Sequence, residues 1–545
     1  MTVGPSAAAW RRFGIAAVAA GALAGCASSP APAAASSALL SARLRRLSNV
    51  EYERSANALL RSQQPIRDAL PPDERQDGYV INERQTVPSY YAEELARVAD
   101  QLAARAVAHD LARMIPCPAA DGVRSRCVRR ALDQLALDAF RRPPTASESA
   151  SLQALFERGA SEAGPDGADA DPRASGARLV LSTLLSSSSM LYLSELGDAR
   201  TTAGAVTTLT PYEIASSLAY AVTGGPPDPE LLAAAADPSR LAKPAAREAQ
   251  ARRLLSLSST REHFREFVLE WLEVDQLERT AKATALVPDY DAVKGHMLDE
   301  TRAFVDEVMV YGGASLASLL AARFTSPDRV MAAYYGIAGF AGPRVSLTRQ
   351  GRVGVLEQAS FLSAHAYEDV TSPVKRGDFV LRRVLCVDLP RPGEVGIDTT
   401  MPPRDENVTT RARFAAHTRA ESCRSCHASI DPLGFSFESF DAAGRYRTRE
   451  HGQPVTAAGE VTLGGRTLRF RDNAELSLSL STLPESRSCF AKQALRYLTG
   501  RRSEAAEQWF AEVVDGLPSR GRDSLLEWVV AWVKSPEFIL RRRAS

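Results

Sequence analysis

Three helix-starting motifs set the fold class of this 545-residue chain. They are Ser48–Glu51, Thr145–Glu148 and Thr210–Glu213. In each, a Ser or Thr hydroxyl and a Glu three residues later can satisfy each other's backbone N–H groups at the first turn of a helix. Pro211 takes the first helical position of the third motif, and the run Gly224-Gly225-Pro226 predicts where that helix ends.

Two further segments repeat apolar residues at helical spacing. The first contains Phe264, Phe267, Val268, Trp271 and Leu272, and the second contains Leu525, Trp528, Val529, Trp532 and Val533. We expect both stripes to face a core and not a cofactor. Residues 460–463 and 466–470 alternate around Gly464-Gly465 and predict a β-hairpin, the one clear strand pair. The predicted fold is mainly α, with several helical domains in tandem and a short hairpin.

Composition limits the classes of protein to which the chain can belong. Apolar residues make up 45% and charged residues 24%, and 66 Lys plus Arg oppose 65 Asp plus Glu, which leaves a formal charge of +1. A nucleic-acid-binding protein needs a basic face, and a disordered chain combines low hydrophobicity with high net charge. We therefore expect a soluble multi-domain protein with no nucleic-acid partner.

The N-terminus has the pattern of an export signal. Arg11 and Arg12 precede an apolar run, residues 13–23, which is too short to span a membrane. The run ends in Leu23-Ala24-Gly25-Cys26, which resembles a bacterial lipobox, so we expect cleavage before Cys26 and a lipid on its sulfur. A cleaved signal with an incidental cysteine is the alternative, and the Ala/Ser/Pro-rich residues 27–37 favour a tether. The predicted location is the cell envelope, on a periplasmic or outer-membrane face.

Export also decides how the other cysteines are interpreted, because thiols can pair in an oxidising compartment. Seven cysteines less the lipidated Cys26 leave six. Cys117 and Cys127 close a short loop, and a bridge there would stabilise the fold by about 3 kcal/mol. Cys386 and Cys489 are distant in sequence and can pair only through tertiary contact.

The last two cysteines belong to Cys423-Arg424-Ser425-Cys426-His427, which has the C-x-x-C-H spacing of c-type haem attachment. Two thiols three positions apart can both add to haem vinyl groups, and the adjacent imidazole then serves as the proximal iron ligand. The alternatives are a Cys423–Cys426 disulfide beside an uninvolved His427, or a thiolate metal site, for which the chain offers no second ligand pair. We expect one covalently bound haem c with His427 on the metal.

The second axial ligand is left open by the sequence. No methionine follows Met401, whereas a small cytochrome c places its methionine downstream of the motif. The candidates are Met401 and His417 upstream, His451 downstream, or an open position. An open position would permit small-molecule chemistry, whereas a filled one favours plain electron transfer.

The segment Thr371–Gly377 allows two interpretations. Lys375 and Arg376 would suit a haem propionate or an anionic substrate, because a guanidinium can pair with both carboxylate oxygens. Alternatively, Thr371 or Ser372 with Pro373 begins a helix whose Leu381, Val384 and Leu385 are core.

Acidic residues beyond the motif also allow two interpretations. Asp431, Glu438 and Asp441 are candidate calcium ligands, or they form surface ion pairs and turn hydrogen bonds. Asp431-Pro432 with Gly434 predicts a turn. Calcium is therefore a second candidate ligand of the chain.

Several segments in order resemble a known family. They are Arg46–Tyr52, Ala139–Pro143, Leu209–Ala215, Thr371–Gly377, Asp431–Phe435, Phe440–Gly444 and Leu498–Arg501. The chain is similar to large exported proteins built from the consecutive domains of unknown function 1587, 1595, 1592, 1588 and 1585, often called planctomycete cytochrome-associated proteins and also found in myxobacteria. The resemblance implies an architecture but no reaction, because the family has no well-established activity and its haem binding is inferred from the same motif.

The resemblance divides the chain into predicted segments. They are a lipoprotein signal (1–25), a flexible tether (26–43), four helical domains or domain-like regions (44–115, 125–195, 205–338 and 455–540, the last with the hairpin) and a C-x-x-C-H domain (345–450). The chain departs from the family at Ala219–Val222 and lacks the additional cytochrome domain of some members, so a role that needs two haems is not expected.

Two functions are consistent with these features. The first is an exported, membrane-anchored, mono-haem c-type redox protein that exchanges electrons with an unknown partner or oxidises a small substrate outside the cytoplasm. If it is an enzyme, it is a haem-dependent oxidoreductase, although no catalytic residue can be named. The alternative is a non-enzymatic envelope module, with a glycan as candidate ligand, in which Cys423 and Cys426 form a structural disulfide.

Overall fold

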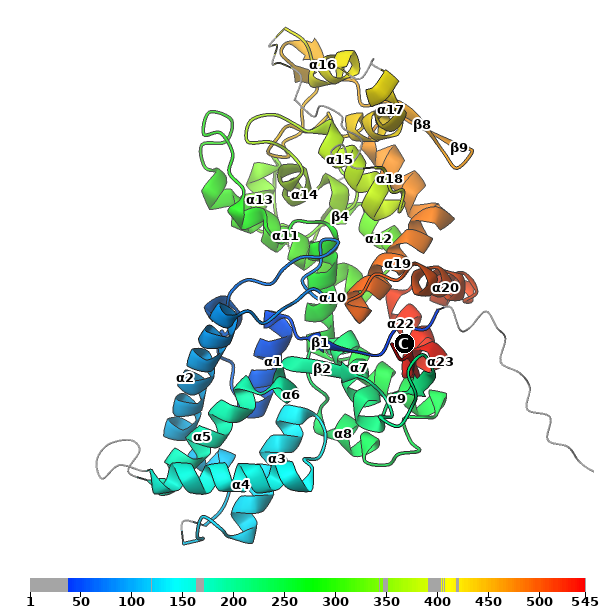
Figure 1. Cartoon of the computed structure of the whole chain (residues 1–545). Helices are drawn as coiled ribbons and strands as arrows, with labels where there is room; N and C mark the ends of the chain where they lie inside the picture. The colour runs from blue at the N-terminus through cyan, green and yellow to red at the C-terminus, as the bar shows by residue number, and fades with distance from the viewer. Residues whose placement is uncertain are drawn as a thin grey trace, which may run out of the picture.

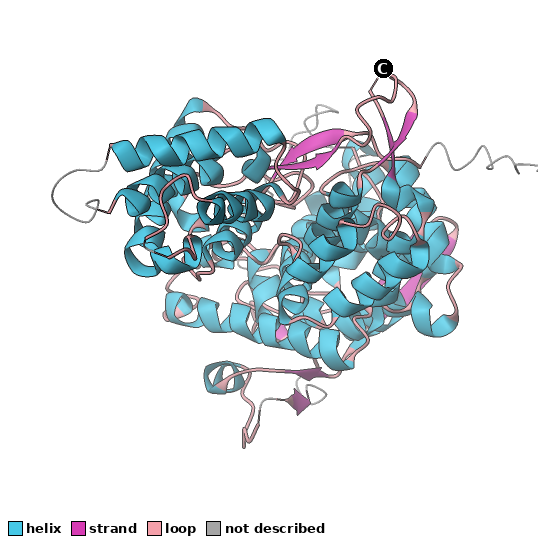
Figure 2. Cartoon of the chain, turned by 90° about the horizontal axis from the view of Figure 1, so that it is seen from below, coloured by secondary structure: helices cyan, strands magenta, loops and turns pink. Residues whose placement is uncertain are grey.

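A computed structural model describes residues 38–544 except 119, 163–170, 343, 347–350, 391–402, 404, 406 and 418–420. Helices dominate the described chain, as predicted (Figure 1, Figure 2). None of the described helices has the length and apolar character needed to cross a membrane. The predicted signal, Cys26, Met401 and most of the predicted tether lie outside the described residues.

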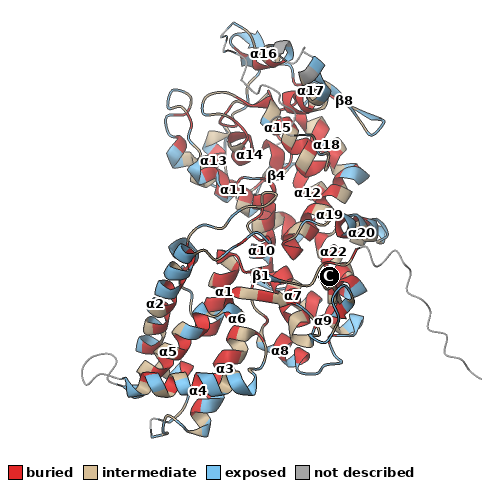
Figure 3. Ribbon diagram, in the orientation of Figure 1, coloured by how far each residue is buried: buried red, intermediate tan, exposed pale blue. Residues whose placement is uncertain are grey.

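The first part of the chain forms one hydrophobic core. Its elements are β1 (Arg43–Arg46), α1 (Asn49–Leu60), the 3₁₀ turn Arg67–Ala69, α2 (Ser89–Met114), α3 (Arg126–Phe140), α4 (Ala146–Ser161), α5 (Pro172–Ser186), α6 (Ser188–Leu191) and β2 (Tyr192–Glu195). In this core, α5 packs against both α2 and α4. The outer faces of α2 and α4 are exposed (Figure 3).

The rest of the chain forms a second, larger core. Its first elements are β3 (Val206–Thr208), α7 (Pro211–Thr223), α8 (Pro229–Ala235), α9 (Pro244–Leu255), α10 (Ser258–Trp271), the 3₁₀ turn Leu277–Arg279, α11 (Tyr290–Tyr311), α12 (Leu316–Ala321), β4 (Phe324–Thr325), α13 (Arg329–Tyr334) and β5 (Val345–Ser346). They are followed by the 3₁₀ turn Val355–Glu357, α14 (Ala359–Ala364), α15 (Pro373–Phe379) with a π-helical continuation Val380–Val384, α16 (Thr410–His417) and α17 (Glu421–Phe435).

The C-terminal elements complete that second core. They are β6 (Arg449–Glu450), β7 (Gln453–Pro454), β8 (Gly459–Leu463), β9 (Arg466–Phe470), α18 (Asn473–Thr482), α19 (Pro484–Thr499), α20 (Glu504–Asp515), α21 (Ser519–Arg522), α22 (Leu525–Lys534), α23 (Pro536–Ile539) and β10 (Leu540–Arg542). The segments predicted as separate domains from residue 205 onward therefore share buried apolar side chains. α16 and α17 lie at the opposite end of the molecule from α3 and α4 (Figure 1).

The predicted helix starts are confirmed. Ser48, Thr145 and Thr210 each form both hydrogen bonds of a capping box, at the starts of α1, α4 and α7. α7 ends at Gly224, whose φ of 64° is left-handed. The apolar stripes of α10 and α22 are buried, as expected.

The strand prediction was correct for one pair and missed four. β8 and β9 form the predicted hairpin around Gly464-Gly465. The described residues also contain the antiparallel pairs β1–β2, β3–β10, β4–β5 and β6–β7. These strands have only two to four residues each, too few for an alternating pattern to be visible in the sequence.

The predicted tether is too long at its C-terminal end. Leu40 is buried in the second core, and the Ala42 N–H donates to the Arg542 carbonyl at 2.7 Å. Ser41 also forms a bridge with Arg542. The composition of this segment does not reveal that its apolar residues can reach a core. Residues 38–43 therefore belong to the folded body and not to the tether.

Glu195 at the end of β2 joins three distant parts of the chain. Its buried carboxylate accepts hydrogen bonds from Arg43 in β1, at 3.1 Å, and from Arg541 in β10. Ser217 in α7 donates to the same carboxylate at 3.3 Å. Burial alone would raise the pKa of Glu195, but the Arg541 and Arg43 guanidiniums lower it to about 2.

Two glycines let α15 and α17 touch backbone to backbone. A Cβ on Gly377 would clash with the Ile430 carbonyl, and a Cβ on Gly434 would clash with the Pro373 carbonyl. The turn predicted at Asp431-Pro432 is wrong, because α17 continues through both residues to Phe435. Pro432 lacks the N–H that a helix interior needs, but it lies close to the helix end. The packing of α17 on α15 outweighs the lost hydrogen bond.

We predict that Gly434→Ala destabilises the protein by about 2 kcal/mol or more, because the methyl group forces the two helices apart. Urea unfolding measures the change. Gly295→Ala in α11 is the control, since nothing lies within 4 Å of the added Cβ, and it should be neutral or stabilising by up to about 1 kcal/mol. Equal stability of the two variants would contradict the close contact.

Candidate functional site

The C-x-x-C-H motif occupies the start of α17. Cys423, Cys426 and His427 are each partly buried on this helix. Helical spacing brings residues three apart to the same face, so the two sulfurs point along one side of α17. Both cysteines are thiols, and neither takes part in a disulfide.

His427 has a carboxylate partner one helical turn away. Its Nδ1 lies 2.7 Å from Oδ1 of Asp431, whose side chain is 9% exposed. A metal-binding imidazole usually donates its second ring N–H to a carboxylate or a carbonyl, which fixes the tautomer and the ring orientation. With Nδ1 engaged, Nε2 is the nitrogen left for an iron atom.

The role of Asp431 was missed at the sequence level. The sequence suggests a calcium ligand or a turn residue at Asp431, because a spacing of four brings it next to His427 only on a helix. The spacing of four between His427 and Asp431 is visible in the sequence, but Pro432 predicts a helix break there and so argues against a helical pair.

A second overlooked residue is Arg413 on α16, the helix that precedes and contacts α17. Its Nε and Nη2 atoms are buried and have no hydrogen-bond partner in the described part of the chain. A buried cationic donor without an acceptor is costly, so an acceptor is expected at this position. Nothing in the sequence distinguishes Arg413 from its neighbours, because burial by tertiary packing separates these two donor atoms from any acceptor among the described residues.

Lys375 and Arg376 serve the structure. Ser372 caps α15 by accepting from the Lys375 N–H, as the helix-capping interpretation predicted. Arg376 is fully buried and donates to four backbone carbonyls, those of Leu362, Phe437, Phe440 and Asp441. Burial lowers the pKa of Arg376 to about 10. The Lys375 ammonium lies 4.2 Å from the Tyr367 ring centroid.

Glu438 and Asp441 are also committed elsewhere. Glu438 is buried and accepts from Arg447 and Thr371, at 2.8 and 2.9 Å. Asp441 accepts the N–H groups of Ala443 and Arg445 in a turn. The three acids therefore have separate partners, as the ion-pair and turn interpretation predicted, but the pairs of Asp431 and Glu438 are buried and not on the surface.

Of the three candidates for the second iron ligand, the structure describes the side chain of one. His451 is exposed in the β6–β7 turn, with a φ of 48°. His417 is the last residue of α16, and its side chain lies outside the described residues. Met401 is likewise outside them.

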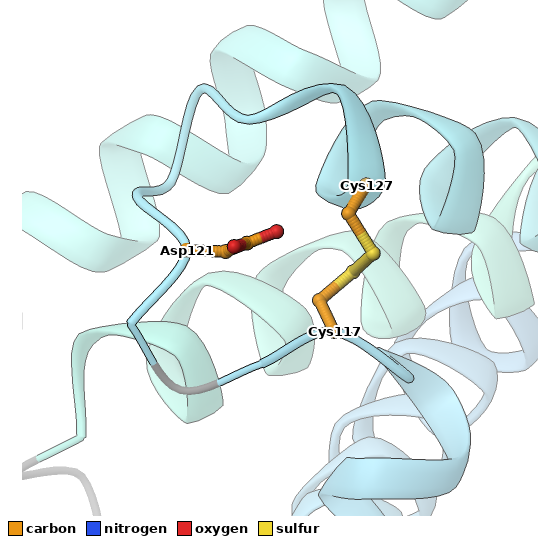
Figure 4. Close-up of side chains that lie close together, drawn as sticks. All are labelled: Cys117, Asp121 and Cys127. Carbon is orange, nitrogen blue, oxygen red and sulfur yellow. A yellow bond between two sulfur atoms is a disulfide. The ribbon is translucent and has the colours of Figure 1, made fainter.

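Both candidate disulfides are present. Cys117–Cys127 closes the loop before α3, and Cys386–Cys489 joins the end of the π-helical segment to α19. Within the described residues, one group of side chains is close enough to hold a metal ion: Cys117, Asp121 and Cys127 (Figure 4). The two sulfurs are bonded to each other, so they are not available as thiolate ligands.

Four family models match consecutive parts of the chain. They are PSD3 (DUF1587) at residues 45–108, PSD5 (DUF1595) at 127–195, PSD4 (DUF1592) at 209–337 and PSCyt3 (DUF1588) at 352–450, each described as a protein of unknown function. The last range contains α15, α16 and α17, and therefore the whole motif. No curated protein and no solved structure matches the chain. The fifth domain, expected at 455–540, stays a prediction.

We predict that the two disulfides stabilise the protein unequally. They span 10 and 103 residues, for which loop entropy gives about 3 and about 4 to 5 kcal/mol, respectively. Urea unfolding of Cys117→Ala/Cys127→Ala and of Cys386→Ala/Cys489→Ala measures both losses. A reductant added to the wild type provides the control, because it should reproduce the combined effect. A larger loss for the first pair would contradict the prediction.

Proposed function

Because the chain belongs to the family in which domains 1587, 1595, 1592 and 1588 follow one another, we propose that it is a mono-haem c-type redox protein. It transfers electrons to a partner or oxidises a small substrate outside the cytoplasm. The proposal includes export and a lipid anchor at Cys26, which rest on the N-terminal sequence pattern.

The observation that carries the proposal is the geometry of α17. Two thiols lie three residues apart on one helix, and the next residue is a histidine held through Nδ1 by a carboxylate. Haem c would be held by thioether bonds to Cys423 and Cys426 and by His427 Nε2. When bound, this group supplies one-electron redox chemistry.

Neighbouring residues have defined tasks in this proposal. Asp431 keeps the Nδ1 proton on His427, orients the ring and increases the electron donation of Nε2. Arg413 offers its two unpartnered donors to a propionate, which would supply the acceptor that this guanidinium lacks. The glycine contact with α15 fixes the position of the helix that carries the motif.

The alternative is a structural disulfide between Cys423 and Cys426 in a non-enzymatic envelope module. The structure contains no bond between the two sulfurs, so it gives this alternative no direct support. The donor set of α17 favours the redox function. The second axial ligand decides between electron transfer and substrate oxidation, and the candidates remain His417, Met401, His451 or an open position.

We expect the exported protein, produced with a haem-attachment system, to gain the mass of one haem and a Soret band that survives acid-acetone extraction. Cys423→Ser/Cys426→Ser should remove both signals, because no thiol remains to form a thioether. The control is Cys117→Ser/Cys127→Ser, which should keep them, since that pair lies in a separate disulfide. A folded wild-type protein without added mass would rule out the proposal.

A second prediction concerns Asp431. In Asp431→Asn the haem should stay attached, but its reduction potential should rise, because a less basic imidazole stabilises ferric iron less. Spectroelectrochemistry measures the potential. Asp291→Asn, an exposed acid on α11, is the charge-matched control and should leave the potential unchanged. Equal potentials for both variants would show that Asp431 does not act through His427.

A further inference from the structure

A pocket of about 490 Å³ lies where β1, β2, α6 and α7 meet the end of α3. These elements lie side by side near the middle of the molecule (Figure 1). The volume is within the range of small-molecule sites, which occur preferentially between domains. None of its lining residues comes from α15 or α17, so the pocket is distinct from the proposed haem site.

Two matched domains build most of this pocket. Phe140, Arg141 and Arg142 come from the second domain, and Thr210, Tyr212 and Glu213 lie at the start of α7 in the third. The remaining wall includes Tyr192 of β2, also in the second domain, and Leu44 of β1, just before the first matched range. Two of the segments on which the family resemblance rests, Ala139–Pro143 and Leu209–Ala215, therefore contribute to one cavity. Helix capping explains only some of the residues in these segments.

Each charged group of the pocket already has hydrogen-bond partners within the protein. Arg141 donates to the carbonyls of Ser189, Met190 and Tyr192 at 2.6 to 3.1 Å. Arg142 binds both carboxylate oxygens of Glu148.

Glu213 completes the paired set. It accepts from the Ser194 hydroxyl, at 2.7 Å, and from the Leu196 and Gly197 N–H groups. A charged ligand would have to displace one of these partners, so the pocket favours a neutral one.

Two hydroxyl groups of the pocket, those of Ser194 and Thr210, donate to Glu213. Those of Ser189, Ser216, Tyr192 and Tyr212 have no hydrogen-bond partner among the described residues. Phe140, Tyr192 and Tyr212 contribute aromatic rings to the same lining. The pocket therefore offers aromatic faces and neutral hydrogen-bonding groups at the same place.

We propose that this pocket binds a neutral saccharide. A sugar ring carries C–H groups on its faces, which pack on aromatic rings, and hydroxyls around its edge, which exchange hydrogen bonds with Ser and Tyr. A purely apolar ligand would leave the hydroxyls of the pocket without partners. The inference goes beyond the proposed redox function and does not depend on haem.

The test is isothermal titration of the full exported chain with cellobiose, maltose, lactose and N,N′-diacetylchitobiose, and with digalacturonate as the acidic probe. We expect saturable binding of at least one neutral disaccharide and weaker binding of digalacturonate. No binding by any of the four neutral sugars, or tighter binding of the acidic probe, would overturn the proposal.

Variants then locate the binding. Tyr212→Ala should weaken it about tenfold by removing the aromatic face, and Tyr212→Phe should weaken it about fivefold or less by removing the hydroxyl alone. Tyr90→Ala, an exposed tyrosine on α2, should leave it unchanged. Tyr212→Phe keeps the packed ring, so its effect can be read even if Tyr212→Ala unfolds. Unchanged affinity in Tyr212→Phe and in a folded Tyr212→Ala would place the sugar elsewhere and overturn the assignment.

Discussion

The buried carboxylate of Glu195 holds the two ends of the described chain together. Arg43 from β1 and Arg541 from β10 both donate to it, and Ser217 adds α7 to the same junction. Removing one partner from a buried ion pair leaves an uncompensated charge, which is strongly destabilising. The strands β1 and β2, which Glu195 fixes, also form a wall of the saccharide pocket. The integrity of that pocket thus depends on a contact between residues 346 positions apart.

Backbone contact at Gly377 and Gly434 fixes the position of α17 against α15. Helices that touch through glycine leave no freedom for sliding, because any larger side chain would collide with a carbonyl. Arg376 of α15 reinforces the contact by donating to the carbonyls of Leu362 in α14 and of Phe437 just after α17. The cysteines and His427 are therefore presented by a rigid element, which suits a redox site, since small reorganisation on electron transfer requires fixed ligands.

The two proposed sites divide the molecule by chemistry. The haem site relies on thiols, an imidazole and buried charge at one end, whereas the pocket in the middle offers hydroxyls and aromatic rings with its charges paired. A small electron carrier needs no scaffold of several helical domains, so a second binding site gives those domains a purpose. If both proposals hold, one chain would bind a neutral ligand and exchange electrons.

The sequence by itself determined the helical class, the three capped helix starts, the buried stripes of α10 and α22 and the β8–β9 hairpin, because each depends on residues close together in the chain. It also located the C-x-x-C-H motif. Only the tertiary structure decided that Asp431 binds His427 and that two donor atoms of Arg413 have no partner among the described residues. It also decided that the Arg376 guanidinium binds backbone carbonyls and that residues 38–43 belong to the folded body. Those outcomes depend on which distant segments come into contact, and local propensity carries no information about such contacts.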